Sequence, residues 1–393
     1  MAAGASLYKC KSMPMLGWLL SIILLLPSTL TAQTFVAERL NAGEPILSAR
    51  HFQQVNAPAL EGDNINGPSV IRLPDWIPPE QRAAPAARYY LYFAHHSGDY
   101  IRLAWARDIE GPWQLYRTGA GVAIGERGVL DMGSERRISL GSDLAITSHI
   151  ASPDVHIDNV AKRIVMYFHG VTRRSGTQFK QQQTYVATSS SGLDFSTGIV
   201  PFPLSRSYLR VFEYNGLLQG LTPDQFHRPR DSADPWAVKD GRADIENGLW
   251  ERHNTRFLEF PRDNQAEKGD RRTPNPRPRH LALYRDGDRM HVFFTMRNHS
   301  PERILSTSVK LTDPDWFEVA AYQAPAEILR AEREWEGGTL APESSRKGAA
   351  RQRQNALRDP FVFSDQGVLY LFYAGGGEQG IGLARLTPQP AGE

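Results

Sequence analysis

The sequence of 393 residues predicts an all-β protein, a five-bladed β-propeller, and two observations carry this prediction. One pattern occurs four times along the chain: an apolar strand, a turn, a second strand ending in paired aromatic residues, a loop and a third strand. The spacing of the four copies leaves room for a fifth between the second and the third. Repeated units of a few short strands are typical of propeller blades.

The second and third strands define the repeat. Both are rich in aromatic and β-branched residues, which at this length favour strands over helices. The second strands are predicted at Tyr89–Ala94, Ile164–His169, Met290–Thr295 and Leu369–Ala374. The third strands are predicted at Ile101–Ala106, Thr184–Ser189, Ile304–Val309 and Ile381–Leu386.

The spacing of the repeats predicts the number of blades. The aromatic pairs end at Phe93, Phe168, Phe294 and Tyr373, so the steps are 75, 126 and 79 residues. The middle step is nearly twice the others, and we expect a degenerate fifth unit to begin near Tyr208–Tyr214. The blade cores are then predicted at residues 64–116, 150–200, 207–275, 279–320 and 357–387. The polar, Arg-rich stretches 262–280 and 331–358 are predicted to be long surface loops.

The last blade lacks an outer strand, because the chain ends soon after its third strand. A closed ring leaves no free sheet edge of this kind. We therefore expect the N-terminal segment, through Gln33–Leu40 or Pro45–Phe52, to supply that strand and close the ring.

The first thirty-two residues have the order of a secretory signal peptide. Lys9 and Lys11 precede an apolar run from Met15 to Leu26, and small residues lead to Ala32. The run is shorter than the roughly 20 apolar residues of a membrane-spanning helix. We expect residues 1–32 to be removed, leaving residues 33–393 as one secreted or periplasmic domain with no membrane anchor. The single cysteine, Cys10, would be removed with them, so we expect no disulfide.

Composition excludes several classes of partner and cofactor. The formal net charge is only +2, with acidic and basic residues interspersed, which argues against nucleic acid and anionic membranes as partners. The sequence has no HExxH motif, cysteine pair, EF-hand loop, Walker loop or dinucleotide fingerprint, so we expect no metal and no cofactor. The oligomeric state is left open.

The hairpins that leave the third strands each place a turn before one large aromatic residue, which is expected to pack between blades. These hairpins are Glu110–Trp113, Ser190–Phe195 and Asp313–Trp316, and Arg358-Asp359-Pro360 opens the last blade. Over about residues 60–386 the chain resembles the five-bladed glycosidases of glycoside hydrolase family 43. The resemblance extends to their invertase-like, neoagarooligosaccharide-hydrolase-like and mannoside-phosphorylase relatives. It implies an exo-acting, inverting glycoside hydrolase, and some of these families carry a calcium or sodium ion in the channel.

The substrate site is expected at one rim of the propeller. The start of each first strand and the end of each second strand lie on this rim, and polar residues gather there in the sequence. Residues expected to bind substrate are Asn66, Trp76, His95, His96, Arg279, His280, Arg297, His299, Arg358 and Glu378.

The catalytic carboxylates implied by the resemblance are only partly present. The family places its base as an Asp before Pro in the first blade, where this chain has Gly67, and Ser152 precedes the proline of the second blade. Only Asp359 is an acid at such a position. His169 or His96 is expected to replace a missing carboxylate, because imidazole titrates near neutrality. The expected catalytic residues are Asp154, Asp359, Glu302 as proton donor, and His169, with Glu378 as the alternative proton donor.

We therefore expect an exported glycoside hydrolase that removes a terminal sugar from a plant- or algal-type glycan. The alternative is a propeller that binds a glycan without cleaving it, which Gly67 favours. Phosphorolysis stays open because of Arg279, Arg297 and Arg358, and so does an interaction scaffold, since a fold does not determine function.

Overall fold

The computed structural model describes residue 1 and residues 34–55, 62–117, 122–141, 143–238, 244–253, 258, 277–318 and 321–389. Residues 2–32 of the expected signal peptide, with Cys10, lie outside this part of the chain. So do residues 262–276 of the first expected surface loop.

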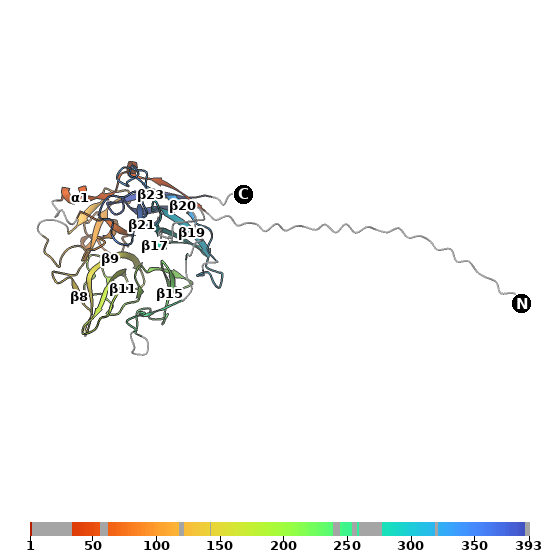
Figure 1. Cartoon of the computed structure of the whole chain (residues 1–393). Helices are drawn as coiled ribbons and strands as arrows, with labels where there is room; N and C mark the ends of the chain where they lie inside the picture. The colour runs from red at the N-terminus through yellow and green to blue at the C-terminus, as the bar shows by residue number, and fades with distance from the viewer. Residues whose placement is uncertain are drawn as a thin grey trace.

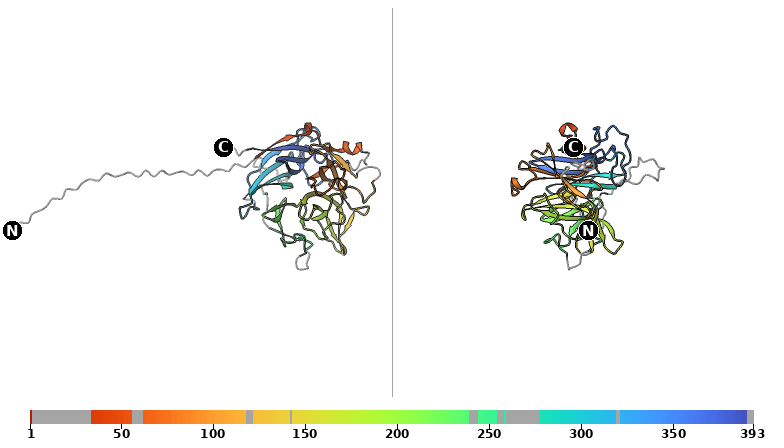
Figure 2. Two further views of the ribbon diagram at one scale, coloured as in Figure 1. Left: turned by 180° about the vertical axis from the view of Figure 1, so that it is seen from behind. Right: turned by 90° about the vertical axis from the view of Figure 1, so that its left-hand side faces the viewer.

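Five antiparallel sheets form a ring, which confirms the predicted five-bladed propeller (Figure 1). The first blade contains β3 (Asn66–Arg72), β4 (Tyr89–Ala94), β5 (Tyr100–Ala106) and β6 (Gln114–Tyr116), with β7 (Leu130–Asp131) also pairing with β5. The second contains β8 (Arg137–Ser139), β9 (Leu144–Asp158), β10 (Arg163–Arg174), β11 (Lys180–Ser189) and β12 (Ser205–Arg206). Figure 2 shows the ring from behind and from the side.

The degenerate third blade contains β13 (Arg210–Tyr214), β14 (Leu217–Thr222), β15 (Gln225–Pro229) and β16 (Trp250–Arg252). The fourth contains β17 (Arg277–Asp286), β18 (Arg289–Arg297), β19 (Ile304–Lys310) and β20 (Ala326–Leu329). The fifth contains β21 (Leu357–Asp365), β22 (Val368–Gly375) and β23 (Gly380–Gln389), joined by β1 (Thr34–Arg39) and β2 (Leu47–Ser48) from the start of the domain. Helix α1 (Ala49–Gln54) follows β2.

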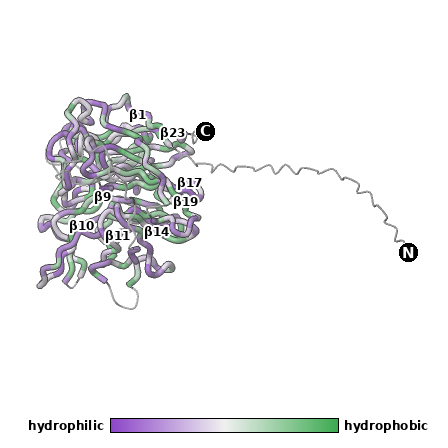
Figure 3. Tube along the Cα trace, turned by 45° about the vertical axis from the view of Figure 1, so that its right-hand side comes forward, coloured by the Kyte–Doolittle hydropathy of each residue, from purple (hydrophilic) through white to green (hydrophobic). Residues whose placement is uncertain are grey.

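Large apolar side chains hold neighbouring blades together, as the turn-plus-aromatic hairpins predicted. Trp113 of the first blade packs edge-on against Phe372 of the fifth, with ring centroids 6.3 Å apart. Phe195 of the second packs against Tyr92 of the first at 6.2 Å. Figure 3 shows hydrophobic segments within the strands of the ring. Because the blades meet through buried rings, the inner strands are held at fixed positions around the channel.

The outer strand of the fifth blade comes from the other end of the described chain. β1 pairs antiparallel with β23, from Thr34 opposite Gln389 to Arg39 opposite Ala384. A buried ion pair holds this strand: Arg39 donates to the fully buried Glu336, with 2.8 Å between Nε and Oε1. Glu336 also accepts from the hydroxyl of Tyr373 at 2.7 Å. Burial opposes ionisation of Glu336, but the hydrogen bonds from Arg39, from two backbone N–H groups and from Tyr373 together outweigh it and lower the pKa of the carboxyl.

The predicted surface loop 331–358 is only partly at the surface, and composition was misleading there. Glu336 is fully buried because its partner, Arg39, comes from the distant N-terminal strand. Ser345 is buried against the end of β18, where its Oγ accepts from the backbone N–H of Asn298 at 3.1 Å. The segment therefore covers one side of the channel rim. Within the described residues, no helix is long and apolar enough to cross a membrane.

We predict that Arg39→Met lowers the free energy of unfolding by about 3–5 kcal/mol, because it leaves the buried Glu336 carboxylate without its counter-ion. The matched control is Arg385→Met on the paired strand. It removes an exposed pair with Glu38, 3.6 Å apart, and should cost less than about 1 kcal/mol. Chemical denaturation measures both values, and equal costs would contradict the assigned role of Arg39.

Candidate active site

A ring of five residues with left-handed backbone marks one end of the channel. Gly67, His280 and Asp359 lie near the start of their inner strands, Tyr208 just precedes β13, and Ser152 lies in the middle of the long strand β9. In four blades the residue coincides with an irregularity in the pairing with the second strand. The five residues and their φ angles are Gly67 (61°), Ser152 (51°), Tyr208 (65°), His280 (45°) and Asp359 (46°). Four of them are not glycine, and a residue held in this region costs on the order of 1–3 kcal/mol. Bulges of this kind re-aim side chains, and they often lie beside active sites.

Gly67 occupies the ring position of the first blade, where the family resemblance implies an aspartate. A Cβ atom at this position would lie 3.3 Å from the Cα of Ser152, which is tighter than ordinary contact. The glycine therefore fits both the positive φ and the close approach of the second blade. As a consequence, Asp359 is the only carboxyl in the ring.

Asp359 is buried and lies against His280, the neighbouring member of the ring. The backbone N–H of Asp359 donates to Nδ1 of His280 at 3.4 Å, and the same nitrogen lies 3.2 Å from Oδ1 of Asp359. An Nδ1 that accepts a hydrogen bond carries no proton, so the second contact is favourable when Asp359 is protonated. Burial, and then the charge of Glu378, raise the pKa of Asp359 to about 7.

Arg358 connects the two expected glutamates. Its guanidinium is buried, with Nε 2.9 Å from Oε2 of Glu302 and Nη1 3.1 Å from Oε1 of Glu378. Its Nη2 donates to Oε1 of Gln354 at 3.1 Å. One cation from the fifth blade thus holds an anion from the fourth and one from its own loop.

Neither glutamate is free to act on a substrate. Both side chains are fully buried. Glu302 accepts from the hydroxyl of Thr295 at 2.8 Å in addition to its arginine partners. Glu378 accepts from Asn64 and Arg358, and its Oε1 lies 3.2 Å from Nδ1 of His96. A role for Glu302 as proton donor would require it to leave these partners.

Neutral aromatic and imidazole rings also line this end of the channel, which we call the mouth. The ring of Tyr208 lies 4.6 Å from that of His169 and 5.5 Å from that of His280, centroid to centroid. Burial is the largest cause that lowers the pKa of His169 and of His280 far below the usual value, so both are neutral. Burial also lowers the pKa of His149, beside His169, to about 4. Nδ1 of His169 is buried with no hydrogen-bond partner in the described part of the chain.

Most of the predicted site residues therefore meet at this mouth, in contact with one another or through one intermediate residue. They are Asn66, His96, His169, Arg279, His280, Glu302, Arg358, Asp359 and Glu378.

His95, Arg297 and His299 lie at the periphery of the mouth. Nε2 of His95 lies 3.3 Å from Oδ1 of Asp63. Arg297 ends β18, and the backbone of His299 accepts from the N–H of Ser345 at 3.0 Å. Trp76 follows the other end of β3 and donates to Asn159 at 3.2 Å, so the structure does not bring it to this site.

Asp154 also lies apart from the mouth, although we expected it to be catalytic. It is two residues further along its inner strand than Ser152 and lines a cavity at the opposite end of the channel. There it contacts His156 and Arg210 and accepts from the backbone N–H of Val211 at 2.9 Å.

Three contributors to the mouth were not predicted from the sequence. Tyr208 carried a usable signal, because it immediately precedes the first strand of the degenerate blade. His149 and Gln354 carried none, because the former lies within a long irregular strand and the latter in a polar loop.

The residues of the channel do not fit the calcium ion that some resembled families carry. The buried guanidinium of Arg210 donates to the carbonyls of Pro153 and Leu281, both at 2.9 Å, and brings a fixed positive charge to the channel wall. Among the described residues, no group of three or more His, Cys, Asp or Glu side chains is arranged to hold a metal ion. Calcium prefers six to eight oxygen ligands, which this wall does not offer.

Comparison with solved structures confirms the resemblance at the level of the fold. A glycosyl hydrolase from Bacteroides ovatus matches with a TM-score of 0.51 and 13% identity, over 92% of this chain and 96% of that chain. The α-L-arabinofuranosidase from Lactobacillus brevis matches with a TM-score of 0.50 and 10% identity, over 89% and 98% respectively. At these identities the likeness extends to the fold alone.

Comparison of sequences gives a more specific result. No family model matches the chain. An uncharacterized protein of Acanthamoeba polyphaga mimivirus is 33% identical over 327 residues, which cover 82% of this chain and 83% of the viral protein. The chain therefore belongs to the same protein family as this mimivirus protein.

Proposed function

We propose that the protein is a glycoside hydrolase that removes a terminal sugar at the mouth of the propeller channel. The observation that carries the proposal is Asp359: a buried carboxyl with a pKa of about 7, held beside a neutral imidazole on a left-handed ring position. A carboxyl that keeps its proton near neutral pH is suited to general acid catalysis. The propeller fold shared with solved glycosidases supports the same proposal.

The proposed reaction uses one acid and one base. Asp359 donates its proton to the glycosidic oxygen as the bond from that oxygen to the anomeric carbon breaks. A water molecule attacks the anomeric carbon, and a ring nitrogen of the neutral His169 accepts the proton that this water loses. Transfer of that proton back to Asp359 through solvent restores both groups.

The loop that covers the mouth supports action on a chain end. The N–H of Ala350 donates to Glu378 at 3.2 Å, and the carbonyl of Arg346 accepts from Arg279 at 3.1 Å. These contacts hold the loop against one side of the mouth, which favours a terminal sugar over the middle of a polymer. The proposed substrates are neutral plant- or algal-type oligosaccharides, in line with the resemblance.

The second candidate is a glycan-binding protein without catalysis. It is favoured by the commitment of Glu302 and Glu378 to Arg358, because glycosidases of this type use two acidic groups and only Asp359 remains. Phosphorolysis is less favoured, because these same two glutamates neutralise the positive charge of Arg358 and Arg279 that a phosphate would need.

We further propose export through the N-terminal signal, on the order of basic, apolar and small residues before Ala32. Expression in a bacterial host with an intact secretion pathway should give a periplasmic or extracellular product whose first residue follows Ala32 or lies close to it. N-terminal sequencing tests this prediction, and a product that retains Met1 in the cytoplasm would contradict it.

We predict that Asp359→Asn lowers kcat by about 100- to 10,000-fold, because it removes the acidic proton and keeps the shape of the side chain. Wild-type activity should fall about tenfold per pH unit above pH 7, as Asp359 loses its proton. Release of reducing sugar from a panel of aryl glycosides and plant oligosaccharides measures both effects.

The exposed Asp286→Asn is the matched control and should keep full activity. Activity that survives Asp359→Asn would refute the assignment of the acid. Binding of the oligosaccharides to wild-type protein with no turnover would select the second candidate.

We also predict that Asp359→Asn stabilises the fold at alkaline pH. The pKa of this carboxyl rises from its ordinary value of 3.8 in the unfolded chain to about 7 in the folded protein, so wild-type stability declines as pH rises through this interval. The asparagine cannot ionise, and the variant should be more stable than the wild type by on the order of 4 kcal/mol above pH 7, with little difference below pH 4. Thermal unfolding across this range tests the sign, and a variant less stable at pH 8 would contradict it.

A further inference from the structure

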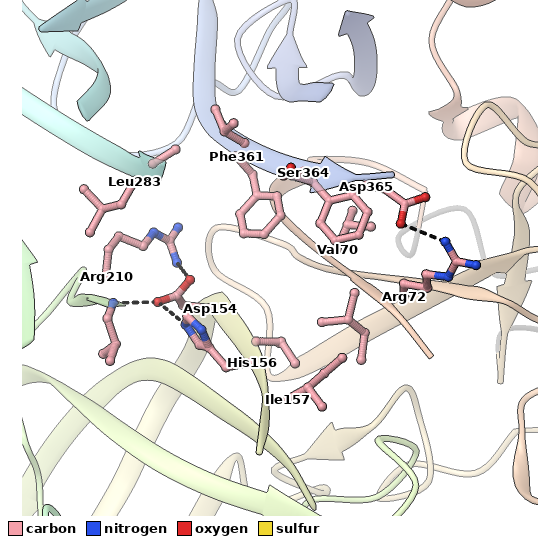
Figure 4. A pocket seen from close by; sticks show the side chains of 16 residues that line it. Val70, Arg72, Asp154, His156, Ile157, Arg210, Leu283, Phe361, Ser364 and Asp365 are labelled. Carbon is pink, nitrogen blue, oxygen red and sulfur yellow. Dashed lines mark hydrogen bonds and ion pairs between the residues drawn. The ribbon is translucent and has the colours of Figure 1, made fainter. Parts of the chain in front are cut away.

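A second cavity opens at the other end of the channel, away from the mouth. Its volume is about 350 Å³, near the lower end of the roughly 300–1,000 Å³ found for small-molecule sites. All five inner strands contribute to it, four through their middle and later residues and β13 through its first two, Arg210 and Val211. None of the left-handed ring residues lines it. Figure 4 shows Asp154, His156 and Arg210 together on one side and Phe361 and Val70 across from them.

The polar wall of this cavity is built around the carboxylate of Asp154. Its Oδ2 accepts from the N–H of Val211 at 2.9 Å and lies 3.1 Å from Nε2 of His156. Its Oδ1 lies 3.8 Å from Nη1 of Arg210, beyond hydrogen-bonding distance. Burial opposes ionisation, but His156 and Arg210 outweigh it and lower the pKa of Asp154. Oδ1 is therefore a negatively charged acceptor that can take a further donor.

The opposite wall is apolar and carries an aromatic ring. Phe361 is half-buried on β21 and faces the cavity, with Val70, Ile157 and Leu283 around it. An aromatic face left partly uncovered inside a cavity suits a ring with an apolar face of its own.

The charges that line the cavity balance. Arg210 lies beside Asp154, and at the rim Arg72 pairs with Asp365 at 3.0 Å. An ionic ligand would lose its hydration here without meeting a net counter-charge. The cavity therefore favours a neutral ligand with hydroxyl donors on one side and C–H groups on the other.

We propose that this cavity binds one neutral sugar ring, with hydroxyl groups donated to Asp154 and its apolar face on Phe361. The site is separate from the mouth, because the guanidinium of Arg210 bridges the carbonyls of Pro153 and Leu281 between them. The proposal goes beyond the hydrolase function and does not depend on it.

The test is titration of the full domain with five neutral monosaccharides (L-arabinose, D-xylose, D-galactose, D-glucose and D-mannose), followed by saturation-transfer NMR. We expect at least one to bind with a Kd on the order of 1 mM, as small ligands of this size do. Leu283→Trp, which fills the cavity, should abolish this binding, and His156→Ala should weaken it about tenfold by removing a partner of Asp154. Circular dichroism melting verifies that each variant is folded.

Asp359→Asn and Tyr208→Ala are the matched variants at the mouth and should keep the binding that Leu283→Trp removes. The proposal is overturned if no monosaccharide binds. It is also overturned if binding is lost in the mouth variants and unchanged in His156→Ala. If Leu283→Trp fails to fold, the result for His156→Ala alone tests the proposal. The His156 side chain is 39% exposed, so its removal leaves the core intact.

Discussion

The buried guanidinium of Arg358 is the interaction on which the candidate site depends. It lies between Glu302 and Glu378, and the three charges share a region with almost no exposure to solvent. Such an arrangement costs several kcal/mol in desolvation per ion and persists only when each charge has its partners. The partners come from the fourth and fifth blades, and Asn64 of the first blade completes the shell of Glu378. The polar cluster thus joins three blades at the mouth.

The state of Asp359 follows from this cluster. His96, and after it Arg358 and Asn64, together outweigh burial and lower the pKa of Glu378. The negative charge of Glu378 then adds to burial in keeping a proton on Asp359. The left-handed backbone of the ring places Asp359 against His280, and the strain of that backbone is offset by the pairing of the strands that follow it. The ion cluster therefore stabilises the mouth, and the proposed acid, Asp359, lies beside it.

The sequence was sufficient for the fold because the signal is local and repeated. Paired aromatics at steps of 75 and 79 residues, with a gap of 126, require five blades whatever the loops contain. The rim was predictable for the same reason. Neighbouring strands of a blade run in opposite directions, so the start of each first strand and the end of each second strand lie at the same end of the channel, and the polar residues of the sequence are found at these positions. The ion-pair partners of the site residues could not be predicted, because nothing near Glu302 or Glu378 in the sequence indicates that one arginine binds both. Asp154 was misplaced for a geometric reason, because two residues along an inner strand move a side chain about 7 Å toward the other end of the channel.

The fold is common to many glycosidases, whereas the proposed chemistry depends on features of this chain: Gly67 replaces an acid, and neutral histidines surround the acid that remains. The central claim is that Asp359 is protonated near neutral pH. Infrared difference spectroscopy of the carboxyl stretch during a pH titration, with Asp359→Asn as the reference, measures this directly. We predict a buried carboxyl band that disappears near pH 7 in the wild type and is missing from the variant. A band that disappears near pH 4, or one that persists in the variant, would contradict the claim.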